Sequence, residues 1–119
     1  MTMRRYNKYS ARKTGHYASR KESRRAAQLR LMERAGLISN LREQVTFELI
    51  PPQYGECGVD LKGRPVKVCV ERSCKYIADF VYEMDGATVV EDTKGFRTPE
   101  YRIKRKLMLF RFGIKIRET

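Results

Sequence analysis

The chain has 119 residues, which suits one domain with a single modest core and is too short for a cofactor domain plus a substrate domain. Lysine and arginine number 26 against 14 aspartates and glutamates, giving a net charge of +12 at pH 7. This balance is typical of proteins that bind a polyanion such as nucleic acid. No stretch approaches the ~18 apolar residues of a membrane span, and no apolar signal segment follows the first arginines, so we expect a cytoplasmic protein.

The first part of the chain is the most basic. Residues 1–17 carry many charges and few aliphatic side chains, so we expect a mobile arm there and a single domain over residues 18–119. The candidate phosphate contacts are Arg4, Arg5, Lys8, Arg12 and Lys13, with Arg20 and Lys21 following. A generally solvated basic surface is the alternative interpretation, and the uneven distribution of charge argues against it.

Residues 19–22 have the pattern of a capping box. Ser19 and Glu22 predict the start of a helix that runs to Ala35 and ends at Gly36. Glu22 then has two interpretations. Its carboxylate caps the backbone of Ser19, or it leans toward the core with Ala26 and Leu29, at i+4 and i+7 on the same stripe. Both roles can coexist, because one carboxylate has two oxygens.

The next segments predict strands and an insertion. Residues 41–50 alternate as a strand does, and Pro51 and Pro52 end it. Glycines between residues 53 and 75 indicate loops or a small extra hairpin, with a strand over 66–70. The cysteines Cys57, Cys69 and Cys74 lack the spacing of a zinc site, and we expect them to be reduced.

Residues 76–94 predict a hairpin that brings two carboxylates together. Asp85 and Gly86 suit a type I′ turn between two β-rich runs, because both central residues of that turn need positive φ. A two-residue turn there places Asp79 opposite Asp92, and Lys94 lies on the same face two residues further on. Opposed like charges are destabilising. Oxygen ligands at this separation suit a hard cation such as Mg²⁺, and an adjacent lysine can orient or deprotonate water.

A second helix is predicted to follow. Thr98, Pro99 and Glu100 have the residue types of an N-cap, a first helical position and an acidic first turn. We expect an apolar stripe to pack in the core and the basic residues to form either a solvated face or a track for the DNA backbone. The stripe is Ile103, Leu107 and Phe110, and the basic residues are Arg102, Lys104, Arg105 and Lys106. A last strand is predicted over residues 113–117.

Asp79 followed by Asp92-Thr93-Lys94 resembles the signature of PD-(D/E)XK nucleases, with Ala78 in place of the proline. Nearly the whole chain resembles a group of small phage and prophage proteins predicted to carry this nuclease core. The matching segments are residues 8–14 (KYSARKT), 19–22 (SRKE), 35–38 (AGLI), 76–80 (YIADF) and 90–95 (VEDTKG), and the least similar part is roughly 51–75.

The resemblance implies a restriction-endonuclease-like αβββαβ core, an α/β (α+β) fold with a mixed sheet flanked by helices. It implies that Asp79, Asp92 and Glu22 hold Mg²⁺ or Mn²⁺ and that Lys94 completes the catalytic set. By analogy with small Holliday-junction resolvases, the substrate would be branched or junction DNA, cut without sequence specificity in the DNA metabolism of a phage or prophage within a bacterial host. Whether two subunits pair as a homodimer is left open.

Two other classes of function fit the charge. One is a basic DNA-binding protein without catalysis, in which phosphate contacts give salt-sensitive, non-specific affinity. The other is a role in RNA assembly like that of a ribosomal protein, which charge alone suggests. The opposed aspartates favour the nuclease, because a binding protein gains nothing from them.

Overall fold

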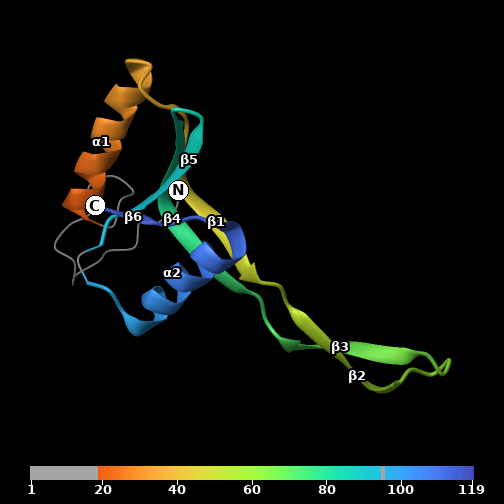
Figure 1. The fold of residues 1–119 in the computed structure, drawn as a ribbon. Helices are drawn as coiled ribbons and strands as arrows, with labels where there is room; N and C mark the ends of the chain where they lie inside the picture. The colour runs from red at the N-terminus through yellow and green to blue at the C-terminus, as the bar shows by residue number, and fades with distance from the viewer. Residues whose placement is uncertain (1–18, 95) are drawn as a thin grey trace, which may run out of the picture.

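The computed structural model describes residues 19–94 and 96–119, which form a mixed α+β fold (Figure 1). The elements are α1 (Arg20–Arg34), β1 (Ser39–Ile50), β2 (Gln53–Val59), β3 (Pro65–Glu71), β4 (Cys74–Met84), β5 (Ala87–Asp92), α2 (Pro99–Phe112) and β6 (Arg117–Glu118). With β2 and β3 set aside, the order is helix, three strands, helix, strand, as predicted. The predicted basic arm, with Arg4, Arg5, Lys8, Arg12 and Lys13, lies outside the described residues.

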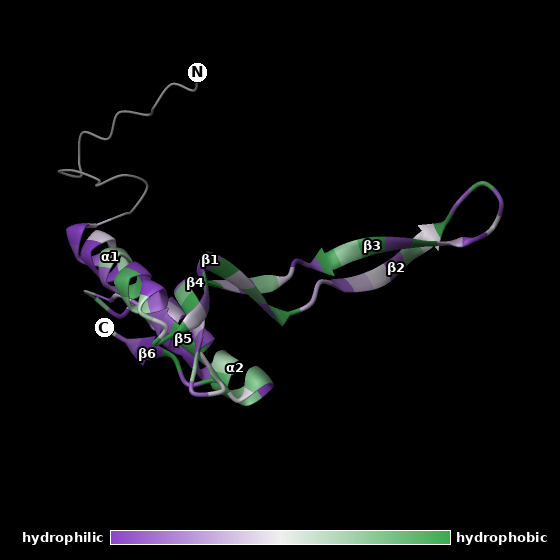
Figure 2. Cartoon of the chain, turned by 90° about the horizontal axis from the view of Figure 1, so that it is seen from above, coloured by the Kyte–Doolittle hydropathy of each residue, from purple (hydrophilic) through white to green (hydrophobic). Residues whose placement is uncertain are grey.

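The larger sheet has the order β1-β4-β5-β6, with β6 parallel to β5 and the other neighbours antiparallel. The strands β2 and β3 pair only with each other in the described structure. Of the two predicted alternatives for this segment, loops or a small extra hairpin, the hairpin is confirmed. Figure 1 and Figure 2 show this hairpin extending away from the helices and the larger sheet. It contributes no residue to the two buried clusters, which lie between that sheet and the helices.

The β4–β5 hairpin has the predicted register. Val81 pairs with Val90 and Met84 with Ala87, so the turn contains only Asp85 and Gly86. Their φ angles are 52° and 80°, the positive values that a type I′ turn needs. The register confirms the alignment that brings Asp79 near Asp92.

Helix α1 begins and ends as predicted. The Oγ atom of Ser19 accepts a hydrogen bond from the backbone N–H of Glu22 over 3.1 Å, and Gly36 follows the helix with a φ of 81°. Glu22, Ala26 and Leu29 are all buried, so the predicted stripe is the inner face of the helix.

Helix α2 begins at the predicted cap, where Thr98 Oγ1 accepts from the N–H of Tyr101 over 3.0 Å. The predicted apolar stripe is wrong, however, because Ile103 is 59% exposed and Phe110 is 88% exposed. Tyr101 and Met108 are the buried residues, and Leu107 is partly buried. Contacts of the Tyr101 ring with Tyr76 turn the helix onto this neighbouring stripe, a choice that helical periodicity alone cannot make.

The end of the chain also differs from the prediction of a strand over 113–117. Gly113 is the left-handed C-cap of α2, with a φ of 69°, and the strand β6 comprises only Arg117 and Glu118. The cysteines Cys57, Cys69 and Cys74 are free thiols, as expected. In the described part of the chain, neither helix is long and apolar enough to cross a membrane.

Two buried clusters meet at the middle of the sheet. Before Asp79 on β4, Tyr76 and Ala78 pack in the cluster formed with α2. After Asp79 the strand contributes to both clusters, with Phe80 and Tyr82 in the one formed with α1 and Val81 in the one formed with α2. The same change of partner occurs along β1 around Gln44, where φ is 54°. Asp79 and its neighbour Gln44 therefore lie where the regions covered by the two helices meet.

Candidate active site

The carboxylates of Asp79 and Asp92 lie together at the end of the β4–β5 hairpin. The backbone N–H of Thr93 donates to Asp79 Oδ2 over 2.9 Å, which fixes one oxygen of that carboxylate. Burial, a hydrogen bond shared with Asp92 and the negative charges of Asp92 and Glu22 raise the pKa of Asp79 to about 7. The two acids thus interact strongly, as their predicted opposition requires.

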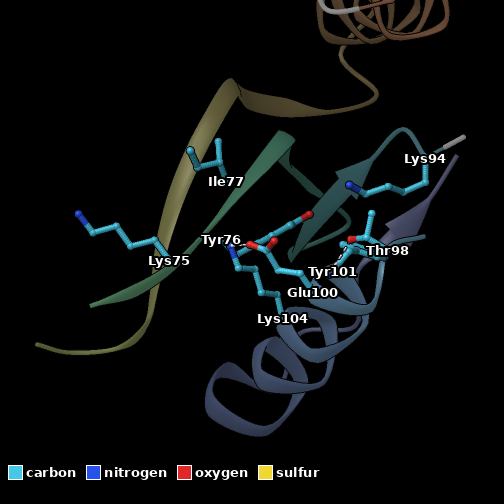
Figure 3. A pocket seen from close by; sticks show the side chains of 8 residues that line it. All are labelled: Lys75, Tyr76, Ile77, Lys94, Thr98, Glu100, Tyr101 and Lys104. Atoms are coloured by element: carbon cyan, nitrogen blue, oxygen red, sulfur yellow. Dashed lines mark hydrogen bonds and ion pairs between the residues drawn. The ribbon is translucent and has the colours of Figure 1, made fainter. Parts of the chain in front are cut away.

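Lys94 contacts this pair. Its Nζ atom lies 3.2 Å from Asp92 Oδ2 and 4.2 Å from the centre of the Tyr101 ring. Figure 3 shows the side chain reaching from the segment after β5 toward β4 and the start of α2. The predicted convergence of Asp92 and Lys94 is confirmed, and one quarter of the lysine side chain remains exposed.

Tyr76 is a contact that the sequence analysis missed. Its buried hydroxyl donates to Asp92 Oδ2 over 2.7 Å. Burial and the bond to Asp92 raise the pKa of Tyr76, so the phenol remains a proton donor at neutral pH. A tyrosine in a strand is usually a packing residue. Because Tyr76 and Asp92 are far apart in the sequence, no local pattern predicts this contact.

Glu22 joins the site through Gln44. The Nε2 atom of Gln44 lies 3.1 Å from Glu22 Oε2 and 3.4 Å from Asp79 Oδ1, so one amide links the two carboxylates. The backbone N–H of Glu22 donates to the Ser19 cap, whereas its carboxylate accepts from Gln44 on the inner side of the helix, as the core-facing interpretation predicts. Gln44 was missed, because an exposed glutamine with an unusual φ has no recognisable sequence pattern.

The carboxylates at this site are the kind of ligand that a hard divalent cation binds, but only two of the three lie next to each other. Asp79 and Asp92 offer adjacent carboxylate oxygens, which Mg²⁺ and Mn²⁺ accept. Glu22 is separated from Asp79 by the Gln44 amide, and among the described residues no three His, Cys, Asp or Glu side chains are grouped so as to hold a metal ion together. The residues thus fit a cation held by the two aspartates, with Glu22 behind them.

The basic residues predicted to bind DNA have different surroundings. Arg20, Lys21, Arg102 and Lys106 are exposed. Lys104 pairs with Glu100 over 2.9 Å, and Arg105 donates to Glu118 over 3.1 Å. Glu118 also accepts from Arg97 and Tyr101, so Arg105 helps to attach β6 to α2.

A further buried acid, Glu91, lies next to Asp92 and was not predicted. Arg25 of α1 donates to both of its oxygens, over 2.8 and 2.6 Å, and the hydroxyl of Tyr82 donates to it as well. Burial alone would raise the pKa of Glu91, but these hydrogen bonds and the charge of Arg25 lower it. This network attaches α1 to β5 three residues after Glu22.

Comparison with known proteins gives a family without an assigned activity. No curated protein and no solved structure matches the chain. Residues 5–118 match a family described as protein of unknown function, DUF1064, and this match includes all the site residues discussed above. The chain belongs to the DUF1064 family.

Proposed function

We propose that this protein is a metal-dependent endonuclease that hydrolyses phosphodiester bonds in DNA. The observation that carries the proposal is the adjacent pair of carboxylates, Asp79 and Asp92, with the Lys94 ammonium 3.2 Å from Asp92, in a chain with a net charge of +12. A buried acid with a raised pKa, such as Asp79, beside a second carboxylate and a cation is typical of functional sites. The resemblance of these residues to the PD-(D/E)XK signature supports the same reaction, as does the αβββαβ order of elements.

The proposed roles follow from the contacts. Asp79 and Asp92 would hold Mg²⁺ or Mn²⁺, which supplies Lewis-acid activation of the phosphate and of water. Lys94 orients or deprotonates the attacking water and offsets the charge that develops on the phosphate. Tyr76 and the Thr93 N–H fix one oxygen each of Asp92 and Asp79, and Gln44 holds Glu22 beside them. Such bonds to ligating carboxylates set their orientation.

The proposed substrate is branched or junction DNA, recognised by shape. In the described residues we see no zinc site and no module for reading base sequence. The resemblance to phage and prophage proteins supports a role in phage DNA metabolism, in the cytoplasm of a bacterial host. Pairing of two subunits as a homodimer is part of the proposal.

The proposal is tested by digestion of supercoiled plasmid and of a four-way junction, with Mg²⁺, Mn²⁺ or EDTA. We expect metal-dependent cleavage, faster on the junction than on a linear duplex of the same sequence. The matched control is Asp85→Asn, which removes an exposed carboxylate in the hairpin turn at a φ that asparagine accepts. This variant should cut as fast as the wild type.

The same assay separates the alternatives. Salt-sensitive binding to the junction without cleavage under any metal condition would indicate a non-catalytic DNA-binding protein. A preference for folded RNA over DNA, again without cleavage, would favour the RNA-assembly role. Cleavage that persists in EDTA would contradict the metal-dependent mechanism.

A further inference from the structure

A hollow of about 340 Å³ opens beside the acid pair, between β4 and the start of α2 (Figure 3). Lys94 forms one end, and Lys75, Ile77 and Lys104 are among the other residues around it. Because the Nζ atom of Lys94 contacts Asp92, the hollow begins directly at the proposed site of hydrolysis.

A second hollow, of about 450 Å³, continues from the first. It is lined by Ser73, Cys74, Lys75, Glu100, Ile103 and Lys104. Lys75, Glu100 and Lys104 line both spaces, so the two form one groove. This groove runs from Lys94 between β4 and α2 to Ser73 and Cys74, at the foot of the β2–β3 hairpin.

The groove carries more positive than negative charge. Lys75, Lys94 and Lys104 face a single lining carboxylate, that of Glu100. The Glu100 side chain is 75% exposed, so its pair with Lys104 is weak and readily exchanged for a phosphate contact. Within the described residues Lys75 forms no ion pair, although Glu48 lies opposite it on β1.

The shape and the apolar lining favour an unpaired strand over a duplex. Each hollow has the volume of a small-molecule pocket, which is too small to enclose base-paired DNA. Ile77 and Ile103 remain 54% and 59% exposed, on the strand side and the helix side of the groove. Exposed apolar side chains beside ammonium groups suit sugars and bases on a backbone of phosphates.

We propose that this groove binds the single DNA strand next to the phosphate that is cut, with Lys75 and Lys104 on successive backbone phosphates. The proposal rests on the proposed nuclease function for the position of the cut, and it specifies the substrate: DNA with an unpaired strand at the site, such as a branch point or an overhang. The strand would leave the site toward the β2–β3 hairpin.

The first test measures binding in EDTA, so that cleavage plays no part. A short fluorescent single-stranded oligonucleotide is titrated with the wild type, Lys75→Gln, Lys104→Gln and the control Lys115→Gln, an exposed lysine outside the groove. Each groove variant should weaken binding severalfold and flatten the slope of log affinity against log salt by about 0.7. Losses no larger than that of Lys115→Gln would overturn the proposal.

A second test reads the position of the strand directly. Cys74 lines the groove, whereas Cys57 and Cys69 are exposed thiols on the hairpin. Saturating oligonucleotide should slow alkylation of Cys74 in the wild type, measured by mass spectrometry, and leave the other two rates unchanged. An unchanged Cys74 rate with bound oligonucleotide would contradict the groove. Protection of Cys74 in a protein that cuts no DNA would retain the groove and reject the nuclease.

Discussion

Two neighbouring residues at the end of β5 show two ways of burying a carboxylate. Glu91 is fully buried, with Arg25 on both oxygens and a hydroxyl from Tyr82. Asp92 is 3% exposed, and it has a second acid, Asp79, beside it. The Glu91 carboxylate is neutralised by an ion pair with Arg25, whereas Asp92 lies beside another acid.

The pKa directions express this difference. The pKa of Glu91 lies below its ordinary value, because Arg25 and Tyr82 outweigh the effect of burial. The pKa of Asp79 is raised by burial and by its acidic neighbours, and the ion pair of Lys94 is with Asp92. A paired buried acid is an ordinary structural feature, whereas an acid pair with incomplete compensation indicates a place for a further cation.

The largest expected effect is the loss of cleavage in Asp79→Asn and Asp92→Asn. Each change removes a charge from the proposed metal site and leaves the basic surface unaltered, so turnover should fall by at least on the order of 10³. Affinity for junction DNA, measured in EDTA by gel shift, should stay equal or increase. Wild-type cleavage rates in either variant would show that the acid pair is not catalytic.

Breaking the other acid site should affect stability. Glu91→Gln leaves Arg25 without its buried anion, and we expect the free energy of unfolding to fall by about 3 kcal/mol in urea denaturation. Glu83→Gln is the matched control, since its partner Arg42 lies 3.6 Å away at a more exposed position and should cost less than about 1 kcal/mol. Equal losses in the two variants would remove the distinction between a buried and a surface pair.

The parts of the fold that sequence reasoning recovered have local causes. The caps of both helices and the Asp85-Gly86 turn depend on a few adjacent residues, and the turn fixes the alignment of Asp79 with Asp92. Lys94 then followed from strand alternation. In the same way, the buried stripe of α1 could be predicted because it contains few competing apolar positions.

The parts that were missed depend on contacts between distant segments. Gln44 reaches Glu22 and Asp79 because β1 is distorted where the regions covered by the two helices meet, and Tyr76 reaches Asp92 across the sheet. Helix α2 has several apolar residues on each side, so only its packing on Tyr76 selects Tyr101 and Met108 over Ile103 and Phe110. Contacts between distant segments determine these features, and no local sequence pattern contains them.

Lys94→Ala should reduce turnover about a hundredfold while metal affinity changes little, because the lysine contributes to the water and the developing charge more than to ligand binding. The measurement is single-turnover cleavage at saturating metal, with metal affinity from a separate titration. Lys115→Ala, an exposed lysine away from the acid pair, should cut at the wild-type rate. A larger loss at Lys115 than at Lys94 would overturn the role of Lys94.

The smallest effect concerns the pH dependence of stability in metal-free buffer. Because the pKa of Asp79 rises from 3.8 to about 7, the native state keeps a proton there that the unfolded chain has already released. Wild-type stability should therefore decline from about pH 4 to pH 7, and Asp79→Asn should flatten that decline and be the more stable protein at pH 8. The pH dependence that Glu91 contributes has the opposite sign. Because its pKa is lowered in the fold, Glu91 stabilises the native state at pH values above its ordinary pKa of 4.5, and this contribution is lost as the pH falls below 4.5. Melting temperatures across the pH range should show a weaker acid limb in Glu91→Gln, while Glu118, whose pKa Arg97 and Tyr101 also lower, keeps part of that limb. The neutral limb should flatten only in Asp79→Asn. If Asp79→Asn melts below the wild type at pH 8, the Asp79 carboxylate stabilises the fold, and the contrast between the two acid sites fails.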